Sequence, residues 1–137
     1  MENNIKLQIC NITKQFEGDD TPTLNNINLE IQKGEFICVV GMSGCGKSTL
    51  LNIIAGLDSA TSGTILLDQK PISEPGIERT VMFQEHGLFP WLNVIDNVCF
   101  GLKMQGLNKS EQFERARYYL DMVQLSDYET YPIHQLS

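Results

Sequence analysis

The length and charge of this 137-residue chain already restrict what it can be. The chain has room for one domain, and its formal charge of −7 argues against nucleic acid or an anionic membrane surface as the main partner, because both attract basic patches. No apolar run approaches the roughly 18 residues that a membrane span needs, and the four cysteines form no CxxC pair. We therefore expect a cytosolic globular protein with reduced thiols and no zinc site.

The first half of the chain has the patterns of strands. Apolar and polar residues alternate along 5–16 and 23–31, which predicts two half-exposed strands. The apolar segment 35–40 does not alternate, so we expect a strand that is covered on both faces, as in a parallel sheet. After a glycine-rich break, residues 47–57 have the pattern of a helix, with Gly56 as its C-cap. Strand, glycine loop and helix in this order indicate an α/β fold.

Helical patterns replace strands towards the end of the chain. Residues 61–68 and 79–83 predict two further short strands, and apolar residues then recur at helical spacing through 94–105. We expect another helix from Asn108, whose side chain can cap it. Glu111 stands three residues later, as in a capping box.

The glycine-rich break carries the clearest chemical signal. Residues 41–49 read GMSGCGKST and match the phosphate-loop pattern G-x-x-x-x-G-K-[ST]. Glycines let the backbone wrap around a phosphate, its N–H groups form an anion cradle, and the start of the next helix adds partial positive charge. We expect Lys47 to reach the β- and γ-phosphates of a nucleoside triphosphate, Ser48 to ligate Mg²⁺ and Thr49 to lie near the α-phosphate. The predicted nucleotide contacts in this loop are Gly41, Ser43, Gly44, Cys45, Gly46, Lys47, Ser48 and Thr49.

A phosphate loop indicates the ligand but leaves the function open. A GTPase would need an NKxD sequence after a strand, whereas NKSE at 108–111 is followed by a helix and preceded by no strand. A small-molecule kinase remains possible from the loop alone. The structural alternative, a merely flexible glycine turn, is disfavoured because an apolar segment precedes the loop and a helix follows it.

Three stretches resemble the ATP-binding subunit of ABC transporters. They are residues 34–68 around the phosphate loop, residues 81–102 with Gln84 in the position of the Q-loop glutamine, and HQLS at 134–137, which looks like the opening of the signature sequence. The segment LFPW, followed by NVIDNV, is similar to the corresponding segment in the ATPases of nitrate, sulfonate, taurine and related importers. ATP with Mg²⁺ is the nucleotide that the resemblance implies.

The resemblance also implies a fold. It is that of an ABC-type P-loop NTPase, with an antiparallel β subdomain and a partial RecA-like core over about 1–90, and a truncated helical subdomain over about 91–137. Family members continue beyond this point, so we expect an amino-terminal fragment that ends at Leu136 and Ser137 of the signature. Such a fragment would lack the Walker B aspartate and the catalytic glutamate. We expect it to be inactive in hydrolysis, and to be poorly stable or to self-associate through an open strand edge.

Residue roles and partners follow from the same resemblance. Gln84 would contact Mg²⁺ and the attacking water, Phe16 would stack on adenine, and the region from Gln84 to Trp91 would contact the permease. Ser137 would face the γ-phosphate held by a second ATPase subunit in a head-to-tail dimer. A periplasmic or extracellular substrate-binding protein would act indirectly, and the protein would lie on the cytoplasmic face of the cell membrane. The alternatives are core packing for Phe16 and burial beneath the helices for Trp91.

Two other functions stay open at this stage. One is a nucleotide-binding or dimerisation module without turnover of its own. The other is an ABC ATPase that serves repair or translation instead of transport.

Overall fold

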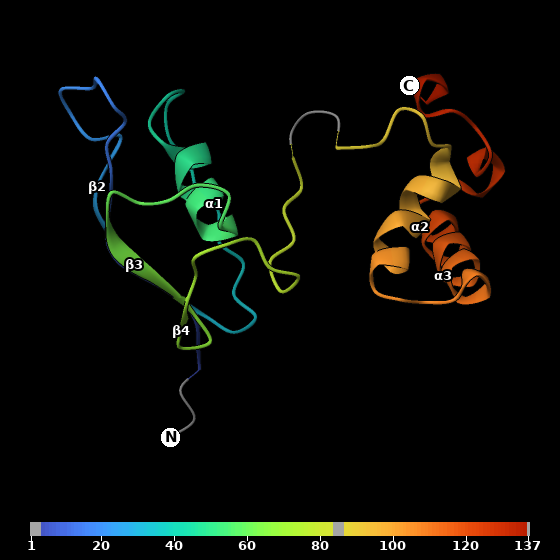
Figure 1. Cartoon of the computed structure of the whole chain (residues 1–137), viewed down its shortest axis with the longest axis horizontal. Coiled ribbons are helices and arrows are strands. Elements are labelled where there is room, and N and C mark those ends of the chain that lie inside the picture. The colour runs from blue at the N-terminus through green and yellow to red at the C-terminus, as the bar shows by residue number, and fades with distance from the viewer. Residues whose placement is uncertain (1–3, 84–86, 137) are drawn as a thin grey trace. The chain divides into compact units, whose positions relative to one another are not determined.

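The computed structural model describes residues 4–83 and 87–136. The chain forms two compact units, Met1–Val81 and Met82–Ser137. The first unit contains an antiparallel sheet with one helix, and the second is helical (Figure 1). No helix in these described ranges is both long enough and apolar enough to cross a membrane.

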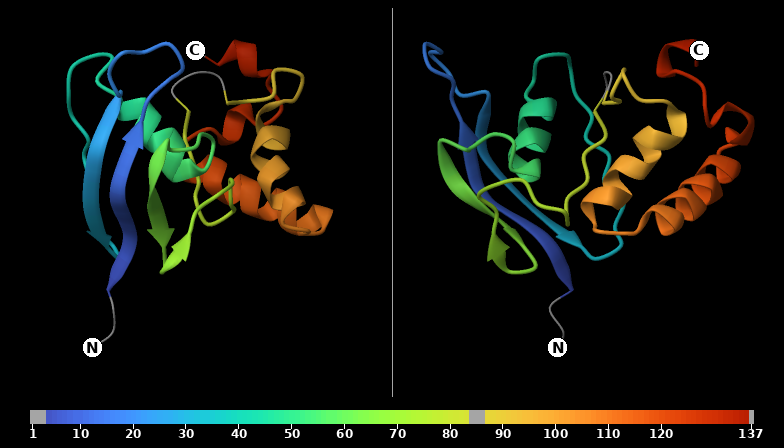
Figure 2. Two further views of the ribbon diagram at one scale, coloured as in Figure 1. Left: turned by 60° about the vertical axis from the view of Figure 1, so that its left-hand side comes forward. Right: turned by 45° about the vertical axis from the view of Figure 1, so that its right-hand side comes forward.

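The sheet of the first unit has four strands in the order β2-β1-β3-β4. They are β1 (Ile5–Lys14), β2 (Leu24–Gln32), β3 (Ser62–Leu67) and β4 (Lys70–Pro71). Each neighbouring pair is antiparallel, and β1 lies between β2 and β3 (Figure 2). The strands predicted at the positions of β1, β2 and β3 are therefore confirmed.

A bulge in β1 reconciles its apolar residues with one face of the sheet. Leu7 and Ile9 are buried and two residues apart, but the next buried residue, Ile12, follows after three. The register with β2 shifts between Ile9 and Ile12, and Asn11 has a left-handed φ of 53°. The extra residue brings Ile12 back to the core face. Gly63 of β3 opposes the bulge, and a Cβ there would collide with the Asn11 carbonyl group.

Helix α1 (Lys47–Ala55) covers one face of this sheet. Its Leu50 and Ile53 belong to the same buried cluster as Ile9 of β1 and Ile65 of β3. Gly56 ends the helix with a left-handed φ of 78°, and its N–H group donates to carbonyl groups of the last turn, which confirms the predicted C-cap.

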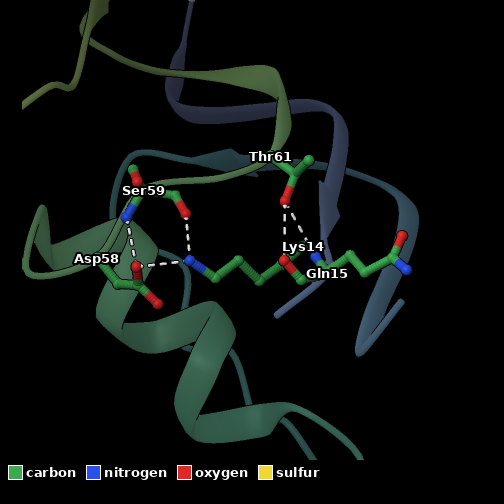
Figure 3. A network of polar contacts seen from close by, with 5 residues as sticks. All are labelled: Lys14, Gln15, Asp58, Ser59 and Thr61. Carbon is green, nitrogen blue, oxygen red and sulfur yellow. Dashed lines mark hydrogen bonds and ion pairs between the residues drawn. The ribbon is translucent and has the colours of Figure 1, made fainter. Parts of the chain in front are cut away.

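A hydrogen-bond network joins the end of β1 to the turn after α1 (Figure 3). Lys14 Nζ donates to Asp58 Oδ1 at 2.7 Å and to the Ser59 carbonyl oxygen at 2.8 Å. The Gln15 N–H donates to Thr61 Oγ1 at 3.0 Å. The hydrogen bond from Lys14 holds the pKa of the Asp58 carboxyl group below its ordinary value.

The second unit is built around two helices, α2 (Val94–Met104) and α3 (Lys109–Met122). Asn93 caps α2. At α3 the predicted capping box is confirmed, because Asn108 Oδ1 accepts from the Glu111 N–H at 3.1 Å and Glu111 Oε2 accepts from the Asn108 N–H at 3.0 Å. The helices share an apolar core of Val94, Ile95, Cys99, Ala116 and Leu120.

The chain after α3 returns to the start of α2, which the sequence patterns did not predict. It forms two 3-10 helices, η1 (Ser126–Tyr128) and η2 (Ile133–Gln135). Between them, the Glu129 carbonyl oxygen accepts from the Ile95 N–H at 2.9 Å, and the Tyr131 carbonyl oxygen accepts from the Val94 N–H at 3.1 Å. The first N–H groups of α2 are thus satisfied by the returning chain.

The strands predicted at 35–40 and 79–83 are wrong for this structure. Neither segment joins a sheet in the described residues, and Phe36 and Val40 are 94% and 83% exposed. Met82 is 96% exposed as well. A covered parallel strand needs hydrogen-bonding neighbours on its edges and packing on both faces, and the described residues offer these segments neither.

Candidate functional site

The phosphate-loop pattern forms a glycine-dependent turn before α1. Gly44 and Gly46 have φ values of 79° and 91°, which residues with a side chain rarely adopt. Gly46 is also buried against the start of β2. A Cβ at this position would lie 2.8 Å from Leu24 Cδ2 and 3.0 Å from the Thr23 carbonyl oxygen, so only glycine fits without displacement.

Helix α1 begins with its backbone donors open. No side chain caps it in the described structure, and its first turn contains no acidic residue. The ladder starts with the Leu50 N–H donating to the Gly46 carbonyl oxygen at 2.9 Å. The N–H groups of Lys47, Ser48 and Thr49 therefore have no acceptor within the helix, and they lie at the positive end of its dipole. An anion is the ligand that such a helix start favours.

The Lys47 ammonium group lies over this loop. Its Nζ donates to the carbonyl oxygens of Gly41 at 2.8 Å and Met42 at 2.6 Å, and it lies 3.6 Å from Cys45 Sγ. Open N–H groups and a positive charge are therefore concentrated in one short segment. This set of donors fits a polyphosphate, whose oxygens can replace the two carbonyl groups as acceptors.

The other predicted loop contacts are accessible to a ligand. Ser43, Gly44, Cys45 and Ser48 are exposed, and Thr49 is half-buried. The hydroxyl group of Ser48 is one oxygen ligand of the kind that Mg²⁺ accepts alongside phosphate oxygens and water. No cluster of three or more His, Cys, Asp or Glu side chains that could hold a metal ion occurs in the described parts of the chain.

Phe16 lies on the surface just beyond β1. The residue is 43% exposed, and Lys14 Nζ lies 4.9 Å from the ring centroid. The alternative that Phe16 packs into the core is therefore wrong. Its ring is available for stacking, with an anchored cation beside it.

Three aromatic rings gather at the start of α2. The ring centroids of Phe89 and Trp91 are 5.4 Å apart, and those of Phe89 and Phe100 are 4.4 Å apart. Trp91 is 76% exposed, so the alternative of a tryptophan buried beneath the helices is wrong. We call Phe89, Trp91 and Phe100 the aromatic cluster.

The remaining predicted site residues are only partly described. Gln84 and Ser137 lie outside the described residues, so the structure gives no geometry for either. Leu136 packs against the apolar core shared by α2 and α3.

Comparison with known proteins gives the family. The profile described as ABC transporter matches residues 24–137. The chain belongs to the ABC transporter family. The resemblance to ATP-binding subunits is thereby confirmed.

Several curated relatives in this family are similar to the chain. The nitrate import ATP-binding protein NrtD of Synechocystis is 50% identical over 129 residues, which are 92% of this chain and 48% of that protein. The taurine import ATP-binding protein TauB of Burkholderia pseudomallei is 45% identical over 83% of this chain and 44% of its own length. An uncharacterised ABC transporter ATP-binding protein of Methanocaldococcus jannaschii is 48% identical over 97% of this chain and 51% of its length. The chain thus spans about half the length of these relatives.

Solved ABC ATPase structures share the fold. A dimeric ATP-binding cassette in a post-hydrolysis state with ADP and Pi matches with a TM-score of 0.82 and 30% identity, over 96% of this chain and 63% of that one. A second dimeric structure, of a bacterial ABC transporter cassette, matches with the same values. The predicted mixed α/β fold with an antiparallel sheet is confirmed.

Sequence reasoning missed two residues around these ABC-family features. Lys14 positions a cation against Phe16 and ties β1 to the turn after α1. Asn97 holds the loop that carries Trp91 through four side-chain hydrogen bonds. A signal was present for Asn97, since it is an uncharged polar residue between the apolar residues of α2, but its partners cannot be read from spacing.

Proposed function

We propose that the chain is the nucleotide-binding part of an importer subunit that couples ATP binding and hydrolysis to uptake of a nitrate-, sulfonate- or taurine-type compound. The observation that carries the proposal is the open first turn of α1 beneath the Lys47 ammonium group. This arrangement suits a triphosphate, and the nitrate and taurine import relatives support the transported class.

Each loop residue has a proposed role towards MgATP. Backbone N–H groups from Gly41 to Thr49 surround the phosphates, and Lys47 moves from its two carbonyl partners to the β- and γ-phosphates. Ser48 and Gln84 would hold Mg²⁺, which would neutralise phosphate charge. Phe16 stacks on adenine, an interaction worth about 1–3 kcal/mol by analogy with base stacking.

The proposed partners follow the same family. The region from Gln84 to Trp91 contacts a permease, and the exposed Trp91 supports this because exposed aromatic side chains are common at the centre of interfaces. A second ATPase subunit binds head to tail, with Leu136 and Ser137 as the start of the signature, and the dimeric cassette structures support this arrangement. The substrate-binding protein acts through the permease, and the subunit lies at the cytoplasmic face of the membrane.

Titration of MgATP into Lys47→Ala tests the proposal. The variant removes the ammonium group from the loop, so we expect at least a tenfold loss of affinity, or about 1.4 kcal/mol. Lys33→Ala is the matched control, since Lys33 is an exposed lysine on the turn after β2 and should bind MgATP as the unchanged chain does. Equal affinity of Lys47→Ala and the unchanged chain would overturn the nucleotide site.

Hydrolysis needs its own measurement. Phosphate release by the complete subunit, assayed beside the titration, separates an ATPase from a module that only binds nucleotide. Binding without any phosphate release from the complete subunit would replace the ATPase proposal with the binding module.

A further inference from the structure

The loop that carries Trp91 is ordered by contacts that do not include Trp91 itself. Residues 89–92 form a turn, closed by the Leu92 N–H donating to the Phe89 carbonyl oxygen at 3.1 Å. Trp91 in this turn is 76% exposed, and its ring lies against that of Phe89, with 5.4 Å between the centroids. An exposed ring on a short turn needs another group to hold it in one orientation.

The side chain of Asn97, one turn into α2, supplies that group. Its Oδ1 accepts from the Phe89 N–H at 2.8 Å, and its Nδ2 donates to the Phe89 carbonyl oxygen at 3.1 Å. Nδ2 also donates to the carbonyl oxygens of Asn93 at 2.9 Å and Leu92 at 3.3 Å. The amide therefore pairs with both backbone groups of Phe89, as a neighbouring strand would, and closes the turn against the helix.

Only an amide satisfies this position. Asn97 Oδ1 is the acceptor of the Phe89 N–H, and Nδ2 lies within hydrogen-bond distance of three carbonyl oxygens, of which those of Phe89 and Asn93 also accept a backbone N–H. A carboxylate would keep the acceptor but set its second oxygen against the three carbonyl groups. An apolar side chain would take the acceptor from the Phe89 N–H and the donor from the Leu92 carbonyl oxygen.

We infer that Asn97 is a positioning residue, which acts through the 89–92 turn to hold Trp91 and Phe89 ready for the permease. The inference rests on the proposed function, because it takes the permease as the partner. Asn97 itself contacts the backbone of the turn, so its effect on the partner is indirect.

Trp91 is the only tryptophan of the chain, and its fluorescence therefore reports on the turn alone. In Asn97→Asp we expect the fast component of the Trp91 anisotropy decay to grow at least twofold. Helix α2 should persist, because a negative charge in its first turns suits the helix dipole. Asn108→Asp is the matched control in the same unit, since aspartate is an equally good N-cap, and it should leave the decay unchanged. An unchanged decay in Asn97→Asp with helix content intact would overturn the inference.

A second variant guards against loss of the fold. In Asn97→Ala, the Phe89 amide should exchange its hydrogen about tenfold faster, since it loses its acceptor. The Asp96 amide, which donates to Asn93 Oδ1 at 2.8 Å, should keep its rate because the α2 cap is untouched. Equal acceleration of both amides would show that Asn97 merely stabilises the helix, and would overturn the positioning role.

Co-sedimentation with membrane vesicles that carry the cognate permease tests the partner. Both Asn97→Asp and Trp91→Ala should bind at least fivefold more weakly than the unchanged subunit. If the turn loosens but neither variant binds more weakly, the positioning role towards the permease fails while the nucleotide site stands. If Lys47→Ala keeps its MgATP affinity, the proposed function fails while the fluorescence result still stands.

Discussion

At the scale of single residues, the Lys14–Asp58 ion pair makes the stability of the first unit depend on pH. The two atoms are 2.7 Å apart, and the hydrogen bond from Lys14 lowers the pKa of the Asp58 carboxyl group. Because the pKa of Asp58 is lower in the folded chain than in the unfolded chain, where it is about 3.9, the ionised carboxylate stabilises the fold above that pH. This stabilisation is lost as the pH falls through the pKa of the folded chain. The side chain of Lys14 is only 12% exposed, so solvent screens this pair less than one on the open surface.

We therefore predict that Asp58→Asn lowers the free energy of unfolding at pH 7 by no more than about 1 kcal/mol, measured by urea unfolding. The difference in stability between the variant and the unchanged chain should shrink towards pH 3. Asp68→Asn is a suitable control. Asp68 pairs with Lys6 at exposed positions, and its φ of 47° is one that asparagine tolerates. A difference that stays constant from pH 7 to pH 3 would contradict the assignment to the carboxylate.

At the scale of elements, the start of α1 depends on Gly46. We predict that Gly46→Ala destabilises the first unit by about 1–3 kcal/mol, because its φ is 91° and a Cβ would collide with Leu24. Gly101→Ala is the opposite case, since Gly101 lies within α2 with nothing within 4 Å of an added Cβ. That variant should be neutral or more stable by up to about 1 kcal/mol. Urea unfolding of both variants decides it, and equal midpoints would refute the strain argument.

Elements also differ in how well their sequence predicts them. The capping box at Asn108 and Glu111 and the C-cap at Gly56 were predictable, because each depends on residues within one turn of the chain. The strand expected at 35–40 was not, because a strand exists only through its neighbours. The role of Asn97 was missed for the same reason, because its side chain bonds to the backbone of a residue eight positions away in the sequence.

At the scale of the whole molecule, the exposed apolar segments govern behaviour in solution. Phe36 and Val40 are almost fully exposed in the first unit, and exposed apolar residues of this kind are typical of interaction surfaces. We predict that the 137-residue chain self-associates as its concentration rises, measured by sedimentation velocity.

Replacing Phe36 and Val40 together by serine should shift that association to higher concentration. The control Met122→Ser, on the outer side of α3 with 61% exposure, should not. A chain that stays monomeric at every concentration and unfolds in one sharp transition would contradict the prediction.

The two α-helices α1 and α2 begin in opposite ways, and this has a consequence for the living cell. The first N–H groups of α2 donate to groups of its own chain, whereas no side chain of the described residues caps α1. If the proposed triphosphate binds at the start of α1, it becomes a structural component of the first unit. Ligand at a hundred times its dissociation constant adds about 2.7 kcal/mol to the stability of whatever binds it. Depletion of the nucleotide would then lower the stability of the folded protein as well as the supply of its proposed substrate.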